Sequence, residues 1–177
     1  VLGKKTNTSY AYQEEQHGTG HAVQVALKNI RKFPDDGIIY VLPGDMGLID
    51  SETLVQFRDE FIKTGSDMLV LTGTFDGIPE ENNCGRILRV KEKDDSGKSS
   101  GSDKDKVIEI IEYKDINSIP DDKTYTTVFN GRRYTYTKKE LIANNEFNSS
   151  VYAFRYNKLV ELIYSITSDN AQNEIYI

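Results

Sequence analysis

Residues 38–74 read IIYVLPGDMGLIDSETLVQFRDEFIKTGSDMLVLTGT, and the order of elements in this segment indicates the fold class. An apolar run from Ile38 to Leu42 predicts a buried strand that runs into a Pro-Gly-Asp turn. Asp50 or Ser51 can cap the helix that follows, and Gly65 is placed to end it. The closing DMLVLTGT predicts a second buried strand. Because strand, helix and strand alternate, the segment predicts an α/β domain with parallel strands.

The residues on the N-terminal side of this segment repeat the alternation. Residues 8–12 have the composition of a short strand, and a glycine-containing turn leads from them into an apolar-periodic, helical stretch over residues 21–33. The sequence therefore predicts a mixed, mostly parallel sheet whose two faces are covered by helices.

The residues on the C-terminal side change character. Residues 85–90 and 107–111 predict two strands, and the charged, Ser- and Gly-rich residues 91–106 predict a flexible loop between them. Residues 121–139 contain Asn-Gly between β-prone residues, which is the signal of a type I′ hairpin, and we expect this hairpin to be inserted at the domain edge. A strand and then an amphipathic helix are predicted within residues 150–166.

Composition argues against two classes of partner. The chain has 177 residues, the size of a single domain, with a formal charge of −6 and an isoelectric point near 5.0. Proteins that bind nucleic acids usually carry a basic stripe, so we expect no nucleic-acid partner. No apolar run approaches the roughly 18 residues of a membrane helix, so we expect no membrane partner. Cys84 is the only cysteine and cannot form an intrachain disulfide, which favours a cytoplasmic protein.

Residues Gln13 to His21, QEEQHGTGH, form the first candidate site. In the ordinary interpretation, Thr19 caps a helix, the glycines form a flexible turn and both histidines face solvent. In the functional interpretation, Gly18 and Gly20 carry no side chain, so a flat ligand can approach the backbone. The amide of Gln13 would then offer a donor and an acceptor to a base edge, and the helix N-terminus would favour phosphate.

Asp45 is the second candidate. It follows the predicted strand of residues 38–42, and ligands commonly bind outside the carboxyl ends of parallel strands. The ordinary interpretation is a turn aspartate. The alternative is a magnesium ligand, because Mg²⁺ takes oxygen ligands from one or two carboxylates and from substrate phosphates.

Residues 13–26, QEEQHGTGHAVQVA, resemble the nucleotide-binding segment of the bacterial-type N-acetylglucosamine-1-phosphate uridylyltransferases, or UDP-N-acetylglucosamine pyrophosphorylases. The resemblance implies a Rossmann-like nucleotidyltransferase fold. It also implies that Gln13 reads the uracil edge and that Gly18 and Thr19 line the base pocket of UTP.

A second match to the same family surrounds Asp45. Residues 44–45, 48–49 and 52–54 are similar to the family's Gly-Asp pair, its hydrophobic pair and its Glu-Thr-Leu helix start. The resemblance implies that Gly44 belongs to the nucleotide site and that Asp45 is the catalytic residue that binds magnesium.

Gly85, Glu112 and Asn148 resemble the sugar-phosphate side of the family. Taken singly, each is an ordinary strand-end or turn residue. The resemblance implies that Gly85 supplies a backbone contact, and that Glu112 and Asn148 hydrogen-bond the hydroxyl and acetamido groups of the sugar. Such pairing is physically reasonable, because a buried polar group without a partner costs about 1–3 kcal/mol. Cys84 stands where a tyrosine is usual, and Ser149-Ser150 where Thr-Gly is usual.

The activity implied by the resemblance is uridylyl transfer with Mg²⁺ as cofactor. UTP and N-acetylglucosamine 1-phosphate would give UDP-N-acetylglucosamine and pyrophosphate. The family's glycine-rich phosphate loop, its lysine and a second metal-binding asparagine have no match, so we expect a piece of a longer protein that is inactive alone. Family members often carry a C-terminal acetyltransferase domain that makes trimers, which leaves a homo-oligomer of the full-length protein open.

Three alternatives stay open. The same fold could transfer another nucleotide to another sugar phosphate, and the nucleoside triphosphate consumed would separate these cases. The unmatched phosphate loop and the two substituted sugar positions also suit a catalytically inactive nucleotide-sugar-binding domain, which pyrophosphate release by the full-length protein would exclude. Finally, the hairpin at Asn130-Gly131 could dock a partner.

Overall fold

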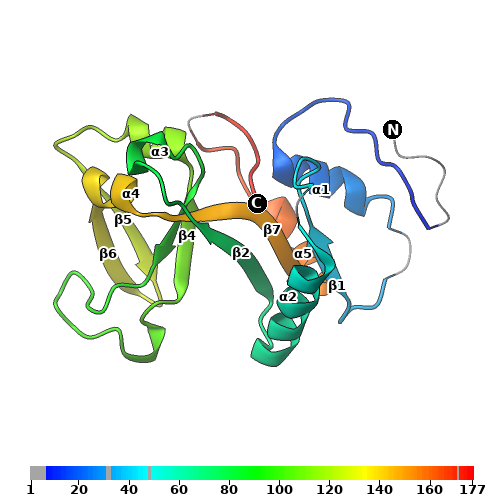
Figure 1. The fold of residues 1–177 in the computed structure, drawn as a ribbon, viewed down its shortest axis with the longest axis horizontal. Helices are drawn as coiled ribbons and strands as arrows, with labels where there is room; N and C mark the ends of the chain where they lie inside the picture. Colours follow the sequence, from blue (N-terminus) through cyan, green and yellow to red (C-terminus); the bar gives the residue numbers. More distant parts are fainter. Residues whose placement is uncertain (1–6, 31–32, 48, 171) are drawn as a thin grey trace. The chain divides into compact units, whose positions relative to one another are not determined.

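The computed structural model describes residues 7–30, 33–47, 49–170 and 172–177. In chain order its elements are α1 (Thr19–Leu27), β1 (Ile38–Val41), α2 (Ser51–Thr64), β2 (Met68–Thr74), the 3-10 helix η1 (Pro79–Glu81), β3 (Arg86–Arg89), η2 (Gly101–Asp103), β4 (Val107–Ile111), α3 (Tyr113–Ser118), β5 (Thr124–Phe129), β6 (Arg132–Thr137), α4 (Lys138–Ala143), β7 (Glu146–Arg155), α5 (Tyr156–Leu162) and η3 (Ile163–Ser165) (Figure 1).

The described residues divide into two compact units, and a single domain stays a prediction. Unit 1 runs up to Leu69 and resumes at Tyr152, and unit 2 is the segment Val70–Val151. The chain passes from one unit to the other inside β2 and again inside β7. Both passages therefore lie within strands rather than in linkers.

In unit 1, β1 pairs antiparallel with residues 152–155 of β7, and Ile38 lies opposite Arg155. α5 follows β7 directly and continues as η3, where the sequence predicts a single helix. Gln24 of α1 donates a side-chain hydrogen bond to the Ile163 carbonyl at 2.9 Å, which ties α1 to η3.

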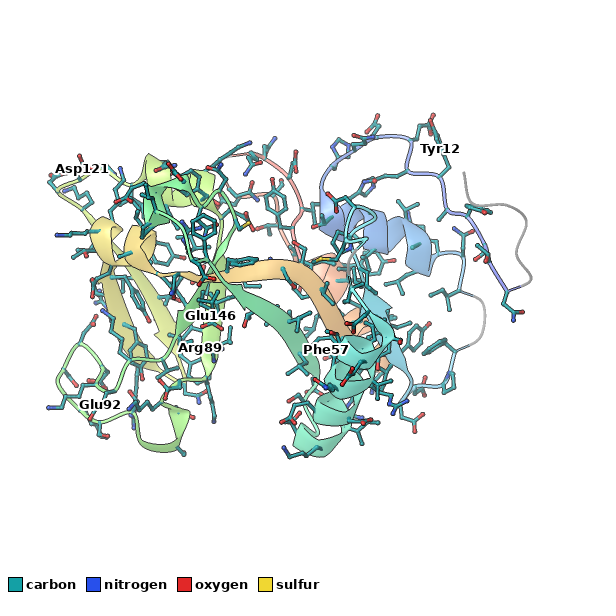
Figure 2. The ribbon with its side chains drawn as sticks, viewed as in Figure 1. Tyr12, Phe57, Arg89, Glu92, Asp121 and Glu146 are labelled. Carbon is teal, nitrogen blue, oxygen red and sulfur yellow. The ribbon has the colours of Figure 1, made fainter. Side chains whose placement is uncertain are left out.

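The helix α2 of unit 1 forms as the sequence predicts. Its N-cap is Asp50, whose carboxylate accepts a hydrogen bond from the backbone N–H of Thr53 at 2.7 Å. Gly65 ends the helix with a left-handed φ of 63°, which glycine adopts without a steric penalty. Phe57 and Phe61 form its buried side (Phe57 is marked in Figure 2).

Unit 2 is built around β3, which lies between β4 and β7. Arg86 pairs with Ile111 of β4 on one side and with Phe147 of β7 on the other. At the far end of β3, Arg89 donates two hydrogen bonds of 2.6 Å to the carboxylate of Glu146, and Figure 2 shows the two side chains together. The core of the unit comprises Leu88, Val90, Ile111, Ile116, Tyr134, Tyr136 and Leu141.

The predicted hairpin forms from β5 and β6. Phe129 lies opposite Arg132, and the two residues between them, Asn130 and Gly131, have φ values of 49° and 74°. Two successive positive φ angles are the requirement of a type I′ turn. The hairpin is more than an addition at the domain edge, because Tyr134 on its inner face is fully buried in the core of unit 2.

Residues 91–106 make tertiary contacts that their composition does not suggest. Ser100 is only 3% exposed, and its hydroxyl lies 3.0 Å from the hydroxyl of Tyr134. The carboxylate of Asp95 accepts hydrogen bonds from the backbone N–H and the hydroxyl of Thr135 at 2.9 and 2.7 Å. The segment is therefore fastened to the hairpin, and its flexibility stays a prediction.

The prediction of a mostly parallel sheet is wrong for the described strand pairs whose register is defined. β1 with β7, β3 with β4, β3 with β7, and β5 with β6 are all antiparallel. The alternation of strands and helices in residues 38–74 carried no information about β7, which comes much later in the chain. This later strand pairs with both β1 and β2, so those two strands are not hydrogen-bonded to each other.

Two predictions near the N-terminus need correction. Residues 8–12 form no strand, and Tyr12 is 86% exposed (Figure 2). High β-propensity cannot form a strand without a neighbour that pairs with its backbone. The helix predicted over residues 21–33 is α1, which begins at Thr19 and ends at Leu27, and residues 31–32 lie outside the described part of the chain.

Candidate functional site

The side chain of Gln13 is held against the start of α1. Its Nε2 atom donates to the Gly18 carbonyl oxygen at 3.4 Å and lies 3.0 Å from Nδ1 of His21. A cavity of about 300 Å³ adjoins it and is lined by Gln13, Gln16, Gly18, Thr19, Ala22 and Glu174. Three residues predicted to bind the nucleotide, Gln13, Gly18 and Thr19, therefore meet at one cavity of unit 1.

The glycines of this loop make room for the protein's own backbone. Gly18 has a φ of 98°, and a Cβ atom there would lie 2.5 Å from the carbonyl oxygen of Ile175. A Cβ atom on Gly20 would lie 2.8 Å from the Ile175 side chain. The Gly20 N–H donates to the Ile175 carbonyl at 2.8 Å, and the Ile175 N–H donates to the His17 carbonyl at 2.8 Å. A ligand would therefore have to contact this loop from the side that faces the cavity.

Thr19 does not cap α1, contrary to the ordinary interpretation. Gly18 is the N-cap residue, and no side chain caps this helix end. Thr19 is instead the first residue of the helix, and it is exposed beside the cavity.

Gly44 and Asp45 form an exposed turn after β1. The turn is closed by two backbone hydrogen bonds, from Met46 N–H to the Pro43 carbonyl at 3.3 Å and from Gly47 N–H to the Asp45 carbonyl at 2.9 Å. A Cβ atom on Gly44 would meet nothing within 4 Å, so packing does not require glycine there. Asp45 does not line the cavity of Gln13. Leu48, which belongs to the predicted family match, lies outside the described residues.

In unit 2, the three residues predicted to bind the sugar phosphate form a row across adjacent strands. The register that places Arg86 opposite Ile111 and Phe147 places Gly85 between Glu112 and Asn148. The Asn148 N–H donates to the Gly85 carbonyl at 2.9 Å. A Cβ atom on Gly85 would lie 2.8 Å from Oε1 of Glu112, so the carboxylate covers the bare backbone. We call Glu112, Gly85 and Asn148 the sugar row.

The two side chains of the sugar row are positioned differently. Glu112 is the N-cap residue of α3, but its side chain makes no capping hydrogen bond. Burial, with a smaller contribution from Asp115, raises the pKa of its carboxyl group. Asn148 is 8% exposed, and its Oδ1 atom accepts the backbone N–H of Ser150 at 2.9 Å. The row thus combines a half-buried carboxyl group with a tethered amide.

Arg86 holds the segment that leads into the sugar row. It is fully buried, and its guanidinium donates to the carbonyl oxygens of Cys84, Asn82 and Pro79 at 2.5, 2.8 and 3.1 Å. The hydroxyl of Tyr113 donates to the Glu80 carbonyl at 2.9 Å, so the residue after Glu112 holds the same segment. Burial lowers the pKa of Arg86. These hydrogen bonds to residues 79–84 therefore fix the position of the Gly85 backbone.

The site residues predicted from sequence thus fall into two groups. The nucleotide residues and Asp45 belong to unit 1, and the sugar row belongs to unit 2. Sequence reasoning missed Arg86 as the support of the row and His21 as the partner of Gln13. Neither contact has a local signal, because one joins a side chain to three carbonyls of a loop and the other spans eight residues across a turn.

Two features are absent from the part of the chain that the structure describes. No helix there is both long enough and apolar enough to cross a membrane. No group of three or more His, Cys, Asp or Glu side chains gathers there as a ready-made metal site.

No protein-family model matches the chain. Curated relatives match it over part of their own length. The chain is 33% identical over 177 residues to the bifunctional protein GlmU of Caldanaerobacter subterraneus subsp. tengcongensis, which covers 100% of the chain and 30% of that protein. It is 32% identical over 173 residues to the protein of the same name from Thermoanaerobacter pseudethanolicus, covering 98% of the chain and 29% of that protein.

A third relative extends the comparison to another bacterial group. The bifunctional protein GlmU of Corynebacterium aurimucosum is 32% identical over 169 residues, covering 96% of the chain and 27% of that protein. The chain therefore spans about 30% of the length of the relatives it matches. From end to end, it is similar to one part of the bifunctional protein GlmU.

Proposed function

We propose that the chain carries the uridylyl-transfer site of an enzyme that forms UDP-N-acetylglucosamine and pyrophosphate from UTP and N-acetylglucosamine 1-phosphate. The sugar row is the observation that carries this proposal. Glu112, Gly85 and Asn148 are far apart in the sequence, yet they adjoin in unit 2, which supports a common role for them. Similarity to the bifunctional protein GlmU along the whole chain supports the same assignment.

The two units supply different contacts in this proposal. In unit 1, the Gln13 amide reads the edge of uracil, and the backbone of Gly18 and Thr19 lines the base pocket. In unit 2, the Asn148 amide and the Glu112 carboxyl group bind the acetamido and hydroxyl groups of the sugar. Gly85 leaves room for the Glu112 carboxyl group, because a Cβ atom at this position would lie 2.8 Å from its Oε1 atom.

The proposed reaction is a direct displacement at phosphorus. A phosphate oxygen of N-acetylglucosamine 1-phosphate attacks the α-phosphorus of UTP, the bond from that phosphorus to the bridging oxygen breaks, and pyrophosphate leaves. No covalent enzyme intermediate is needed. Such transfers depend mainly on positioning and on neutralising charge, so the task of Gln13 and the sugar row is to orient the two substrates.

Magnesium fits Asp45 as one ligand among several. The carboxylate is exposed in the turn after β1, and Mg²⁺ is commonly held by one or two carboxylates together with substrate phosphates and water. When bound, the ion would neutralise negative charge on the phosphates. Asp45 would hold it through a single carboxylate, with phosphate and water oxygens as the other ligands.

Asp45→Asn tests the metal role. We expect at least a ~100-fold loss of pyrophosphate release by the full-length protein, because the neutral amide binds Mg²⁺ poorly. The melting temperature should not change, since Asp45 is exposed. Asp36→Asn, an exposed turn aspartate before β1, is the matched control. Activity of Asp45→Asn near that of the wild type would remove Asp45 from the metal role.

The nucleotide and the reaction are tested separately from the metal. The full-length protein should consume UTP in the presence of N-acetylglucosamine 1-phosphate and release one pyrophosphate for each sugar nucleotide formed. Consumption of another nucleoside triphosphate in its place would overturn the uridylyl assignment. Binding of UTP without any release of pyrophosphate would identify a catalytically inactive binding domain.

A further inference from the structure

We propose that His21 determines the base specificity of this site by fixing the orientation of the Gln13 amide. In that orientation only the amide oxygen is left to meet a base, and the site selects a pyrimidine that carries a hydrogen on N3. The inference rests on the proposed function, because it assumes that Gln13 reads the base.

Two neighbours of Gln13 determine which terminal atom of its amide is the nitrogen and which is the oxygen. The carbonyl oxygen of Gly18 lies 3.4 Å from one terminal atom of the amide, and a carbonyl oxygen can only accept a hydrogen bond. That terminal atom must therefore be the nitrogen, Nε2. The same atom lies 3.0 Å from Nδ1 of His21. Since Nε2 can only donate, Nδ1 of His21 is the acceptor, and the imidazole proton is on its other nitrogen.

These contacts use both hydrogens of the amide nitrogen. A primary amide has two N–H donors on nitrogen and accepts only through oxygen. One N–H is directed at Gly18 and the other at His21. The Oε1 atom has no hydrogen-bond partner among residues 7–30, 33–47, 49–170 and 172–177, and Gln13 lines the cavity of unit 1. Gln13 therefore presents an acceptor to a base.

An acceptor at this position discriminates between pyrimidines. Uracil and thymine carry a hydrogen on N3 and can donate to Oε1 of Gln13. Cytosine has a lone pair on N3, so its N3 and the amide oxygen would repel each other. A site that pairs with a donor rejects an analogue lacking that donor because a buried polar group is left unpaired. The orientation of one amide is therefore enough to separate UTP from CTP.

His21 is the stronger of the two constraints on the amide. Its contact with Nε2 is 3.0 Å, whereas the contact with Gly18 is 3.4 Å, near the limit for a hydrogen bond. His21 itself is fixed in α1, where the preceding residue, Gly20, is hydrogen-bonded to Ile175. Without the imidazole, the Gln13 amide could turn by about 180° at the cost of one weak contact, and it would then offer its N–H groups to cytosine.

His17 provides a matched control. It lies four residues before His21, in the loop that leads into α1, and the two rings are 5.2 Å apart between centroids. Its side chain is exposed, however, and its Nε2 atom lies 2.7 Å from the carboxylate of Glu15 rather than near Gln13. Removing the ring of His17 should leave the orientation of the Gln13 amide unchanged.

The experiment compares kcat/KM for UTP and for CTP in the full-length wild-type protein and in three variants. His21→Leu should lower the UTP-to-CTP ratio about tenfold or more, which corresponds to about 1.4 kcal/mol. His21→Asn should restore most of the ratio, because its side-chain oxygen can accept from Gln13 near the position of Nδ1. His17→Leu should keep the wild-type ratio. A wild-type ratio in His21→Leu, or an equal loss in His17→Leu, would overturn the inference.

A second measurement does not depend on how the variants fold. Nitrogen-15 NMR of the histidine rings in the full-length wild-type protein at neutral pH should show His21 as the tautomer protonated on Nε2. A proton on Nδ1 would overturn the inference. The two levels of failure are distinguishable: a wild-type protein that does not prefer UTP contradicts the proposed function, whereas a UTP preference that survives His21→Leu contradicts only the role of His21.

Discussion

At the scale of the residue, protonation of the Glu112 carboxyl group in the candidate sugar site makes the stability of the protein depend on pH. Its pKa is raised because burial disfavours the charged form and Asp115 adds repulsion. The folded protein therefore holds this proton to a higher pH than the unfolded chain does. The resulting contribution to the free energy of unfolding is fully present below the pKa of the unfolded state. It is lost as pH rises through the raised pKa of the folded state.

Glu112→Gln is therefore expected to raise the free energy of unfolding at pH 7, because the neutral amide needs no charge in a partly buried position. The difference from the wild type should shrink towards zero below about pH 4, where the glutamate is protonated in both states. Urea unfolding at the two pH values measures this. Glu92→Gln, at an exposed position in the loop of residues 91–106, should show no such dependence (Figure 2). A difference that grows as pH falls would contradict the raised pKa.

The sugar row marks how far residue-level prediction extends. Its members were assigned by resemblance, and strand register then placed them together. The supports of the site could not be predicted in the same way. Arg86 bonds to carbonyl oxygens, which every residue type carries, so no sequence pattern points to them. The close packing of Gly18 and Gly20 against Ile175 could not be predicted from the sequence either, because Ile175 is more than 150 residues away in the chain.

At the scale of the element, α4 depends on a reciprocal cap at its first turn. The hydroxyl of Thr137 accepts the Glu140 backbone N–H at 3.2 Å, and the Glu140 carboxylate accepts the Thr137 backbone N–H at 2.7 Å. The helix is short and places Leu141 in the core of unit 2. Its own propensity cannot sustain it, since helices of this length are marginal without packing and caps.

Thr137→Ala should lower the free energy of unfolding by about 1 kcal/mol, the usual cost of losing an N-cap side chain. Thr137→Ser retains the hydroxyl and should cost less than half as much. Chemical denaturation of both variants measures the difference. If serine were as damaging as alanine, the lost methyl group rather than the cap would be responsible.

Elements with local signals were predicted well, and those that depend on distant partners were not. α2 has its cap at Asp50 and its stop at Gly65, and the turn at Asn130 and Gly131 has its own dipeptide signal. Strand direction depends on which strand lies alongside, and β7 is more than 70 residues from β2 in the chain. Residues 8–12 have strand-like composition but remain irregular for the same reason.

At the scale of the whole molecule, the two groups of candidate site residues lie in different units, so we expect substitutions in each unit to change the KM for a different substrate. The nucleotide residues belong to unit 1 and the sugar row to unit 2. Gly85→Ala would place a Cβ atom 2.8 Å from the Glu112 carboxylate and displace it. Under the proposed function, we expect the KM for N-acetylglucosamine 1-phosphate to rise about tenfold, equivalent to about 1.4 kcal/mol, with the KM for UTP changed less than twofold. Steady-state kinetics of the full-length protein tests this, and an equal rise in both constants would refute it.

The passage of β2 and β7 through both units constrains how this protein can be recombined. Exchanging Val70–Val151 for the corresponding piece of a relative would put both crossover points inside hydrogen-bonded strands. The strand register would then have to be the same in both parents at each junction. A slip of one residue would turn every later side chain of the strand to the opposite face. Hybrids joined at the turns that flank these strands keep β2 and β7 each from a single parent, so directed evolution of sugar preference should shuffle there.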